Sequence, residues 1–267
     1  MFLSVTHLDA EYIKRKLPSM YHQFKDLADV DITKAPMEVG PTTHYSMGGL
    51  RVDAETAATN IPGLFASGEV AAGMHGANRL GGNSLSDLLV FGRLSGLHAA
   101  EFAKKNKGQA KVPDAEVQRA MRELVEPFER TSGPSPYEIH EQLQDIMQNL
   151  VGIMRIEEDL KKALNVIQEL RTELRSVRVT GSRMFNPGWH LAYDLRNLLN
   201  TSEAITRSAL ARQESRGAHT RLDHPKTDPE WGKVNHVISK DGEQMHISKS
   251  PLPQMPPELA KLFEEPH

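Results

Sequence analysis

Glycines and isolated charged side chains are concentrated between residues 41 and 98. This stretch holds ten of the 19 glycines and places His44 and Arg79 inside glycine-rich turns. Glycine adopts positive φ without strain and lets the backbone approach a ligand closely. The density of glycine beside charged side chains indicates either a ligand-binding surface or a set of tight turns that join short strands. The rest of the chain has to fold around this stretch.

Two local patterns within the stretch favour the ligand-binding interpretation. Residues 61–70 (IPGLFASGEV) predict a Pro-Gly turn, a short apolar strand and then the carboxylate of Glu69. Residues 81–92 (GGNSLSDLLVFG) predict a double-glycine turn and a helix over 85–97, with Asn83 or Ser84 as its N-cap. The start of a helix presents unpaired N–H groups and a positive dipole end, which suit an anionic or carbonyl-bearing ligand.

The motifs HYSMGG, LFASGEVA and HGANRLGGNSL occur here in that order, and GANRLGGNSL is unbroken over its ten residues. Together they resemble the flavoprotein subunit of succinate dehydrogenase and fumarate reductase. The segment RQESRGAHTRLDHP (212–225) is similar to the same family. The resemblance extends from about residue 5 to residue 231 and therefore covers most of the chain.

Composition excludes several other kinds of protein. The 267 residues carry a net charge of −3, so no basic field indicates a nucleic-acid partner. No apolar run approaches the roughly 20 residues of a membrane span. The chain contains no cysteine, which excludes disulfides, thiol catalysis and cysteine-ligated iron–sulfur clusters within it. The twelve histidines show no zinc-type spacing, so we expect no metal site.

Hydrophobic periodicity predicts a helix-rich second half. A polar linker at 105–113 marks a domain boundary, and a bundle of three or four helices follows it. A short strand is expected near residues 1–5, and another precedes the HYSMGG motif. Short alternations at 234–238 and 244–247 predict a hairpin. Helices are expected over residues 10–24, 114–129 (capped by Asp114), 137–150, 156–177 and 189–213.

These expectations combine with the resemblance into an α+β architecture. The resemblance implies the returning part of an FAD-binding α/β domain, followed by a helical bundle domain and a short β-containing C-terminal tail. The predicted division assigns 1–40 to the end of a capping region and 41–104 to the C-terminal part of the FAD-binding domain with the substrate site. Residues 114–218 form the helical domain, and 219–267 form the tail.

Parts that the family needs have no match in this sequence. There is no GxGxxG loop between a strand and a helix, as a dinucleotide-binding unit requires. In the family, that loop, the histidine that holds flavin covalently and the proton-shuttling arginine all lie earlier in the subunit. We therefore expect this chain to be the C-terminal part of such a subunit, to contain no catalytic residue of its own and to be inactive alone.

The resemblance also assigns residues to the substrate and the cofactor. Arg79 and His44 match the family's ligands for the two carboxylates of the dicarboxylate, and the planar guanidinium of arginine suits a carboxylate because it binds in a bidentate way. Glu69, Ser84 and Leu85 match positions that contact FAD, and Asn83 is a weaker candidate of the same kind. The helix start beside them would stabilise the anionic reduced flavin.

The activity implied is hydride transfer between succinate and FAD, in the tricarboxylic acid cycle or in respiratory electron transport. Electrons would leave through an iron–sulfur subunit to membrane anchor subunits, which would hold the chain at the cytoplasmic side of the bacterial inner membrane. Two alternatives remain open. One is a fragment of an L-aspartate oxidase-like flavoenzyme, and the other is a non-catalytic helical interaction module in which residues 114–216 fold alone.

Overall fold

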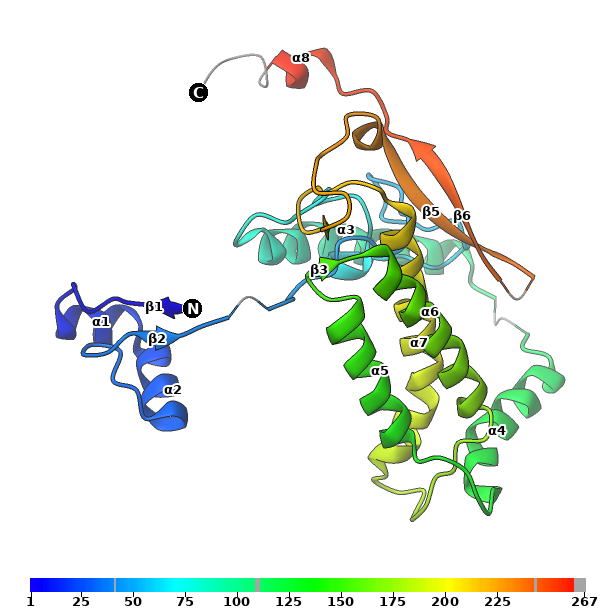
Figure 1. The fold of residues 1–267 in the computed structure, drawn as a ribbon. Coiled ribbons are helices and arrows are strands. Elements are labelled where there is room, and N and C mark those ends of the chain that lie inside the picture. The colour runs from blue at the N-terminus through cyan, green and yellow to red at the C-terminus, as the bar shows by residue number, and fades with distance from the viewer. Residues whose placement is uncertain (41, 109–110, 243, 262–267) are drawn as a thin grey trace. The chain divides into compact units, whose positions relative to one another are not determined.

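A computed structural model describes residues 1–40, 42–108, 111–242 and 244–261 (Figure 1). Within it the chain forms two compact units, Met1–His44 and Tyr45–His267, and each is described by itself. Pro41, which opens the predicted FAD-binding segment, lies outside the described residues. So do residues 109–110 of the predicted linker and 262–267 of the predicted tail. The predicted domain boundaries therefore stay predictions.

The first unit is a small two-stranded sheet with two helices between its strands. Its elements are β1 (Phe2–Leu3), α1 (Ala10–Lys16), α2 (Pro18–Ala28) and β2 (Met37–Glu38), and β1 pairs antiparallel with β2. Ile13, Ile32 and Met37 form its buried core. The prediction of one helix over residues 10–24 is wrong, because Leu17 leaves helical geometry at φ −127°. Pro18 disfavours the helical conformation of the residue before it and is well suited to open the next helix.

The second unit begins with the glycine-rich loops, which lead into a long helix. Its first elements are η1 (Gly68–Val70) and α3 (Asn83–Lys105). The apolar strand predicted within residues 61–70 is reduced to a single antiparallel bridge between Ala58 and Phe65. Gly63 and Gly68 both have positive φ there, which a continuous strand does not accommodate.

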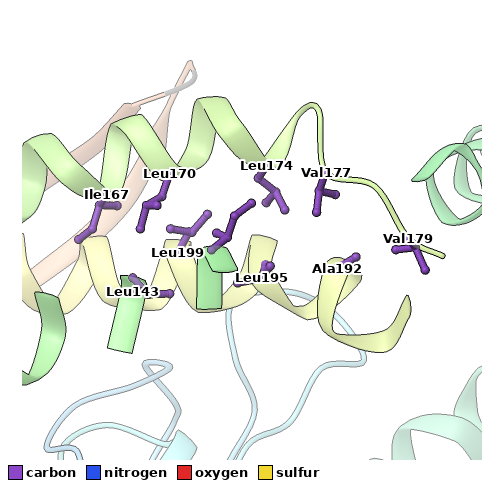
Figure 2. Close-up of a cluster of buried hydrophobic side chains, with 10 residues drawn as sticks. Leu143, Ile167, Leu170, Leu174, Val177, Val179, Ala192, Leu195 and Leu199 are labelled. Carbon is purple, nitrogen blue, oxygen red and sulfur yellow. The ribbon is translucent and has the colours of Figure 1, made fainter. Parts of the chain in front are cut away.

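A helical bundle makes up most of the second unit. It consists of α4 (Asp114–Glu129), α5 (Pro136–Leu150), α6 (Glu157–Leu174) and α7 (Pro187–Ala211). Apolar residues one helical turn apart give α6 a buried stripe, and Figure 2 shows Ile167, Leu170 and Leu174 directed toward Leu195 and Leu199 of α7. The predicted helices are therefore confirmed, with ends shifted by a few residues.

The fourth helix, α4, is attached to α7 by polar and aromatic contacts. The indole Nε1 of Trp189 donates to the carbonyl oxygen of Leu124 at 2.6 Å, and Arg196 pairs with Glu123 at 2.6 Å. Trp189 also packs edge to face on Phe128. Asp114 is the first residue of α4 rather than its cap, because Pro113 occupies the N-cap position.

Small strands and turns complete the second unit. The strands are β3 (Met154–Arg155), β4 (Thr220–Arg221), β5 (Val234–Asp241) and β6 (Gln244–Pro251), and the short helices are η2 (Trp231–Lys233) and α8 (Pro257–Ala260). β5 and β6 form the predicted hairpin, with longer strands than expected, and β3 pairs parallel with β4. The long helices and small sheets agree with the predicted α+β class. In the described part of the chain, none of the helices has the length and apolar character needed to cross a membrane.

Candidate functional site

The HYSMGG and SGEV motifs lie against each other. Leu50 forms a parallel bridge with Ala71 and donates its N–H to the carbonyl oxygen of Val70 at 2.7 Å. Gly49 makes this approach possible, because a Cβ atom at its position would lie 2.2 Å from that same oxygen. The carboxylate of Glu69 accepts a hydrogen bond from the backbone N–H of Ser46 at 2.8 Å. The structure thus joins the predicted flavin-contacting Glu69 to the motif that follows His44 in sequence.

Arg79 lies on the loop before α3, where its guanidinium stacks on an aromatic ring. The Cζ atom of Arg79 is 4.8 Å from the ring centroid of Tyr45. One guanidinium nitrogen, Nη1, donates to the carbonyl oxygen of Leu80 at 3.2 Å. The Nε atom of Arg79 is buried and has no hydrogen-bond partner among the described residues. A buried N–H group without an acceptor costs about 1–3 kcal/mol, so its presence calls for an explanation.

A buried histidine–carboxylate pair lies behind the Tyr45 ring. His75 meets Tyr45 edge to face, with ring centroids 5.4 Å apart. Its Nε2 atom is 3.2 Å from Oδ2 of Asp87 on α3, and the two side chains are only 11% and 5% exposed. Burial raises the pKa of the Tyr45 phenol, and the negative charges of Asp87 and Glu69 raise it further. Tyr45 is therefore an uncharged phenol at neutral pH.

The start of α3 is largely exposed. Gly82 is the N-cap residue with φ +84°, and no side chain caps the helix, so the expectation that Asn83 or Ser84 would do so is wrong. Asn83 and Leu85 are exposed, while Ser84 is half-buried. A Cβ atom at Gly73, Gly76 or Gly82 would meet no heavy atom within 4 Å. The N–H groups of Asn83 and Leu85 donate to the carbonyl oxygens of Leu80 and Gly82 at 3.2 Å, so what the helix start offers an anionic group is the positive end of its dipole beside exposed glycine backbone.

The ESRGAH segment (residues 214–219) belongs to a charge cluster that was not predicted as part of the site. Glu214 is fully buried and accepts hydrogen bonds from Arg212 at 2.5 Å and from Arg216 at 2.9 Å. The backbone N–H of Asp228 donates to its other oxygen at 2.9 Å. Burial alone would raise the pKa of this carboxyl, but the bonds from Arg216, Asp228 and Arg212 outweigh it and lower the pKa to about 2.

This segment touches the loop that carries Arg79. The backbone N–H of Ala218 donates to the carbonyl oxygen of Ala77 at 2.9 Å. Gly217 has φ +58°, and a Cβ atom there would lie 2.4 Å from the same oxygen. Since Ala77 is only two residues from Arg79, the ESRGAH segment holds the backbone of the HGANR motif in place through this contact.

Replacing Gly217 by alanine is expected to lower the free energy of unfolding by about 2 kcal/mol, because the new Cβ atom would overlap backbone. Gly242→Ala is the matched control, since Gly242 has φ +59° and open space around it. Urea unfolding followed by tryptophan fluorescence would compare the two variants. Equal losses in both would show that the contact with Ala77 contributes nothing beyond backbone strain.

One group of side chains has the composition of a metal site. Glu157, Asp223 and His224 each offer a ligand atom within 4.8 Å of the others. Both carboxylate oxygens of Asp223 already accept hydrogen bonds from the buried guanidinium of Arg221, at 2.8 and 2.7 Å. This bidentate bond lowers the pKa of Asp223. The cluster is better described as an ion pair that joins the segment after β4 to the start of α6, since the backbone N–H of Glu157 also donates to Asp223 at 2.8 Å.

The predicted site residues are brought together only in part. All but one of the predicted site residues lie in the second unit: Glu69 in η1, Arg79 on the loop before α3, and Asn83, Ser84 and Leu85 in the first turn of α3. His44 is exposed and is the last residue of the first unit. That His44 and Arg79 bind the two carboxylates of one ligand therefore stays a prediction.

Sequence reasoning missed the structural partners of these residues. Tyr45 was visible as the aromatic residue next to His44, and Asp87 as an acidic residue among apolar residues of a helix. Neither signal is specific. Gly217 and Glu214 lie within the ESRGAH motif, but the contact with Ala77 joins segments about 140 residues apart, and sequence spacing cannot indicate it.

Two family models match the chain. The model described as "Fumarate reductase flavoprotein C-term" matches residues 140–261, and the "FAD binding domain" model matches residues 1–85. Among curated proteins, a fumarate reductase (CoM/CoB) subunit of Methanothermobacter marburgensis is 42% identical over 256 residues, which are 93% of this chain and 44% of that protein. The fumarate reductase flavoprotein subunit of Escherichia coli is 37% identical over 85% of this chain and 38% of that protein.

Solved structures agree with these sequence matches. A structure of Mycobacterium smegmatis Sdh1 in complex with UQ1 superposes with a TM-score of 0.84 at 49% identity and covers 99% of this chain and 45% of that one. An E. coli quinol fumarate reductase structure superposes with a TM-score of 0.87 at 34% identity, over 96% and 45% of the two chains. The chain thus spans less than half the length of the relatives that it matches.

Proposed function

Because this chain belongs to the flavoprotein-subunit family of succinate dehydrogenase and fumarate reductase and corresponds to part of that subunit, we propose that it supplies a dicarboxylate clamp and one wall of the FAD pocket. The intact subunit would transfer a hydride between succinate and FAD. The observation that carries the proposal is the state of Arg79, whose buried Nε atom has no acceptor among the described residues.

Arg79 suits one carboxylate of a dianion for physical reasons. Its guanidinium stays charged at any relevant pH and offers two parallel N–H groups to a carboxylate. The bond from Nη1 to Leu80 and the ring of Tyr45 hold the group in place, so little freedom is lost when a ligand binds. His44 is proposed for the second carboxylate on the resemblance to the family alone.

We propose that the start of α3 lies beside the isoalloxazine ring of FAD. A Cβ atom at Gly73, Gly76 or Gly82 would meet no heavy atom within 4 Å, and no side chain caps the start of α3, which supports a ligand lying close to this backbone. We propose that Glu69, Ser84, Leu85 and Asn83 line this side of the ring. When bound, FAD supplies the hydride acceptor. The N-terminal end of α3 would stabilise negative charge on the reduced ring system.

The complete enzyme needs more than this chain. We propose that electrons leave through an iron–sulfur subunit, and that association with a membrane takes place through anchor subunits on the cytoplasmic side. The names of the relatives as fumarate reductase and succinate dehydrogenase subunits support this arrangement. The chain alone is proposed to be inactive, because the dinucleotide loop and the proton-shuttling arginine have no match in it.

Arg79→Gln is expected to weaken binding of malonate, a non-reacting dicarboxylate, about 10- to 100-fold, because it removes a charge-assisted bidentate contact. Chemical-shift titration of the chain with malonate would measure this. Arg122→Gln is the matched control, since Arg122 is exposed on α4 and the change in charge is the same. Unchanged affinity in Arg79→Gln, or an equal loss in both variants, would contradict the assignment of the clamp to Arg79.

A further inference from the structure

We propose that Tyr45 is a positioning residue for Arg79, and that His75 and Asp87 hold Tyr45 in place. The proposal deepens the proposed function and rests on it, because it concerns how the same dicarboxylate clamp is oriented. The contacts form a continuous series. The guanidinium of Arg79 lies over the Tyr45 ring at 4.8 Å, the ring meets His75 at 5.4 Å, and His75 reaches Asp87 at 3.2 Å.

The face of the Tyr45 ring restrains Arg79 where hydrogen bonds do not. Among the described residues, the Arg79 guanidinium donates to Leu80 through Nη1, and its Nε atom has no acceptor. A guanidinium stacked on an aromatic face is held in plane without using its N–H groups, so they stay available to a carboxylate. Tyr45 therefore fixes the orientation of Arg79 without competing with the ligand.

The other end of the series is anchored in α3. Asp87 is buried within the first turns of this 23-residue helix, and His75 is nearly as well buried. Arg79 lies in sequence between His75 on the loop and Asp87 on α3. The contact between His75 and Asp87 therefore ties the two ends of this segment together beside the Tyr45 ring. The same helix start forms the proposed flavin wall. The series thus fixes the position of the carboxylate clamp relative to that wall.

The uncharged state of Tyr45 agrees with this role. A tyrosine phenol is protonated at neutral pH, and burial raises the pKa of Tyr45 further, so the ring meets Arg79 as a neutral group and not as a phenolate. The aromatic face is the part of Tyr45 that contacts Arg79, while the hydroxyl interacts with the carboxylate of Asp87. Phenylalanine retains that face, whereas leucine is apolar but smaller and has no aromatic face.

The test compares Tyr45→Leu with Tyr45→Phe in the whole chain. In the unsubstituted chain, the NMR signals of the Arg79 side chain should show an upfield ring-current shift that Tyr45→Phe keeps and Tyr45→Leu loses. Malonate affinity should fall about tenfold in Tyr45→Leu and stay within about twofold in Tyr45→Phe. Tyr193→Leu is the matched control, because it removes another tyrosine ring over which an arginine lies. The Cζ atom of Arg196 is 6.0 Å from the centroid of that ring, and both residues are far from the site in sequence.

The possible outcomes separate this inference from the proposed function. If Arg79→Gln weakens malonate binding but Tyr45→Leu does not, the inference is overturned and the clamp stands. If Tyr45→Leu fails to fold, a missing ring-current shift on Arg79 in the unsubstituted chain overturns the inference, and its presence there and in Tyr45→Phe supports it. If Arg79→Gln leaves malonate binding unchanged, the proposed function fails, and the positioning role fails with it.

Discussion

Glu214→Gln is expected to lower the free energy of unfolding by about 3–5 kcal/mol, the cost of removing one partner from a buried ion cluster. Glu214 is fully buried between Arg212 and Arg216, and its oxygens accept four hydrogen bonds from them and from Asp228. Glutamine fills the same volume but leaves two arginines without their counter-charge. Urea unfolding of the variant and of the unsubstituted chain would measure the loss.

Glu169→Gln provides the control for this change. Glu169 lies exposed on α6, so the same substitution there should change stability by less than about 0.5 kcal/mol. A loss of similar size in both variants would show that the cluster contributes no more than an ordinary surface carboxylate. A stability gain in Glu214→Gln would mean that desolvation of the carboxylate outweighs its pairing.

The second large effect is a loss of stability in mild acid. His219 accepts a hydrogen bond at Nδ1 from Arg155 at 2.9 Å and donates from Nε2 to the carbonyl oxygen of Arg212 at 3.3 Å. This arrangement needs a neutral imidazole ring, because a protonated ring has no nitrogen that can accept the bond from Arg155. Burial lowers the pKa of His219 to about 4, and the neighbouring arginines contribute to the same shift.

The direction of the effect follows from where protons bind. Between about pH 6.5 and pH 4 the unfolded chain takes up a proton on His219 that the folded chain does not, so stability falls as pH falls. A lowering of the His219 pKa by this amount corresponds to a loss of about 3 kcal/mol in the free energy of unfolding once the pH has fallen to about 4. Glu214, with its pKa of about 2 in the folded chain, extends the loss below about pH 4.5.

Unfolding free energies measured from pH 7.5 to pH 4 in the unsubstituted chain and in His219→Gln would test this. The variant should lose most of the slope. A smaller slope should remain from His236, whose pKa burial also lowers. The same slope in both proteins would contradict a neutral, buried His219.

Regular elements of this fold were predictable from the sequence because their signals are local. The stripe at Leu160, Ile167, Leu170 and Leu174 has helical spacing, and β5 and β6 alternate around a Gly-containing turn. The errors came from backbone geometry at single residues. Pro18 divides the first predicted helix, and Gly82 rather than Asn83 or Ser84 is the N-cap residue of α3.

The candidate site was predictable only as a set of motifs. Arg79 and Glu69 were found because the motifs around them are specific, but their partners were not. The stacking of Arg79 on Tyr45 and the hydrogen bond from Ser46 to Glu69 depend on how the loops fold back on each other. The contact of Gly217 with Ala77 depends on the packing of a segment that is distant in sequence. Such contacts have no periodic signal in the sequence.

We propose that Arg79 binds a substrate carboxylate within the intact flavoprotein. The most direct measurement is succinate-dependent dye reduction by a chimera in which this chain replaces the matching part of the E. coli fumarate reductase flavoprotein subunit. We predict turnover by the chimera, a preference for succinate over L-aspartate, and a loss of about 100-fold or more in Arg79→Gln. Turnover that survives Arg79→Gln would show that Arg79 is not needed to bind the succinate carboxylate, and a preference for L-aspartate would show that succinate is not the substrate.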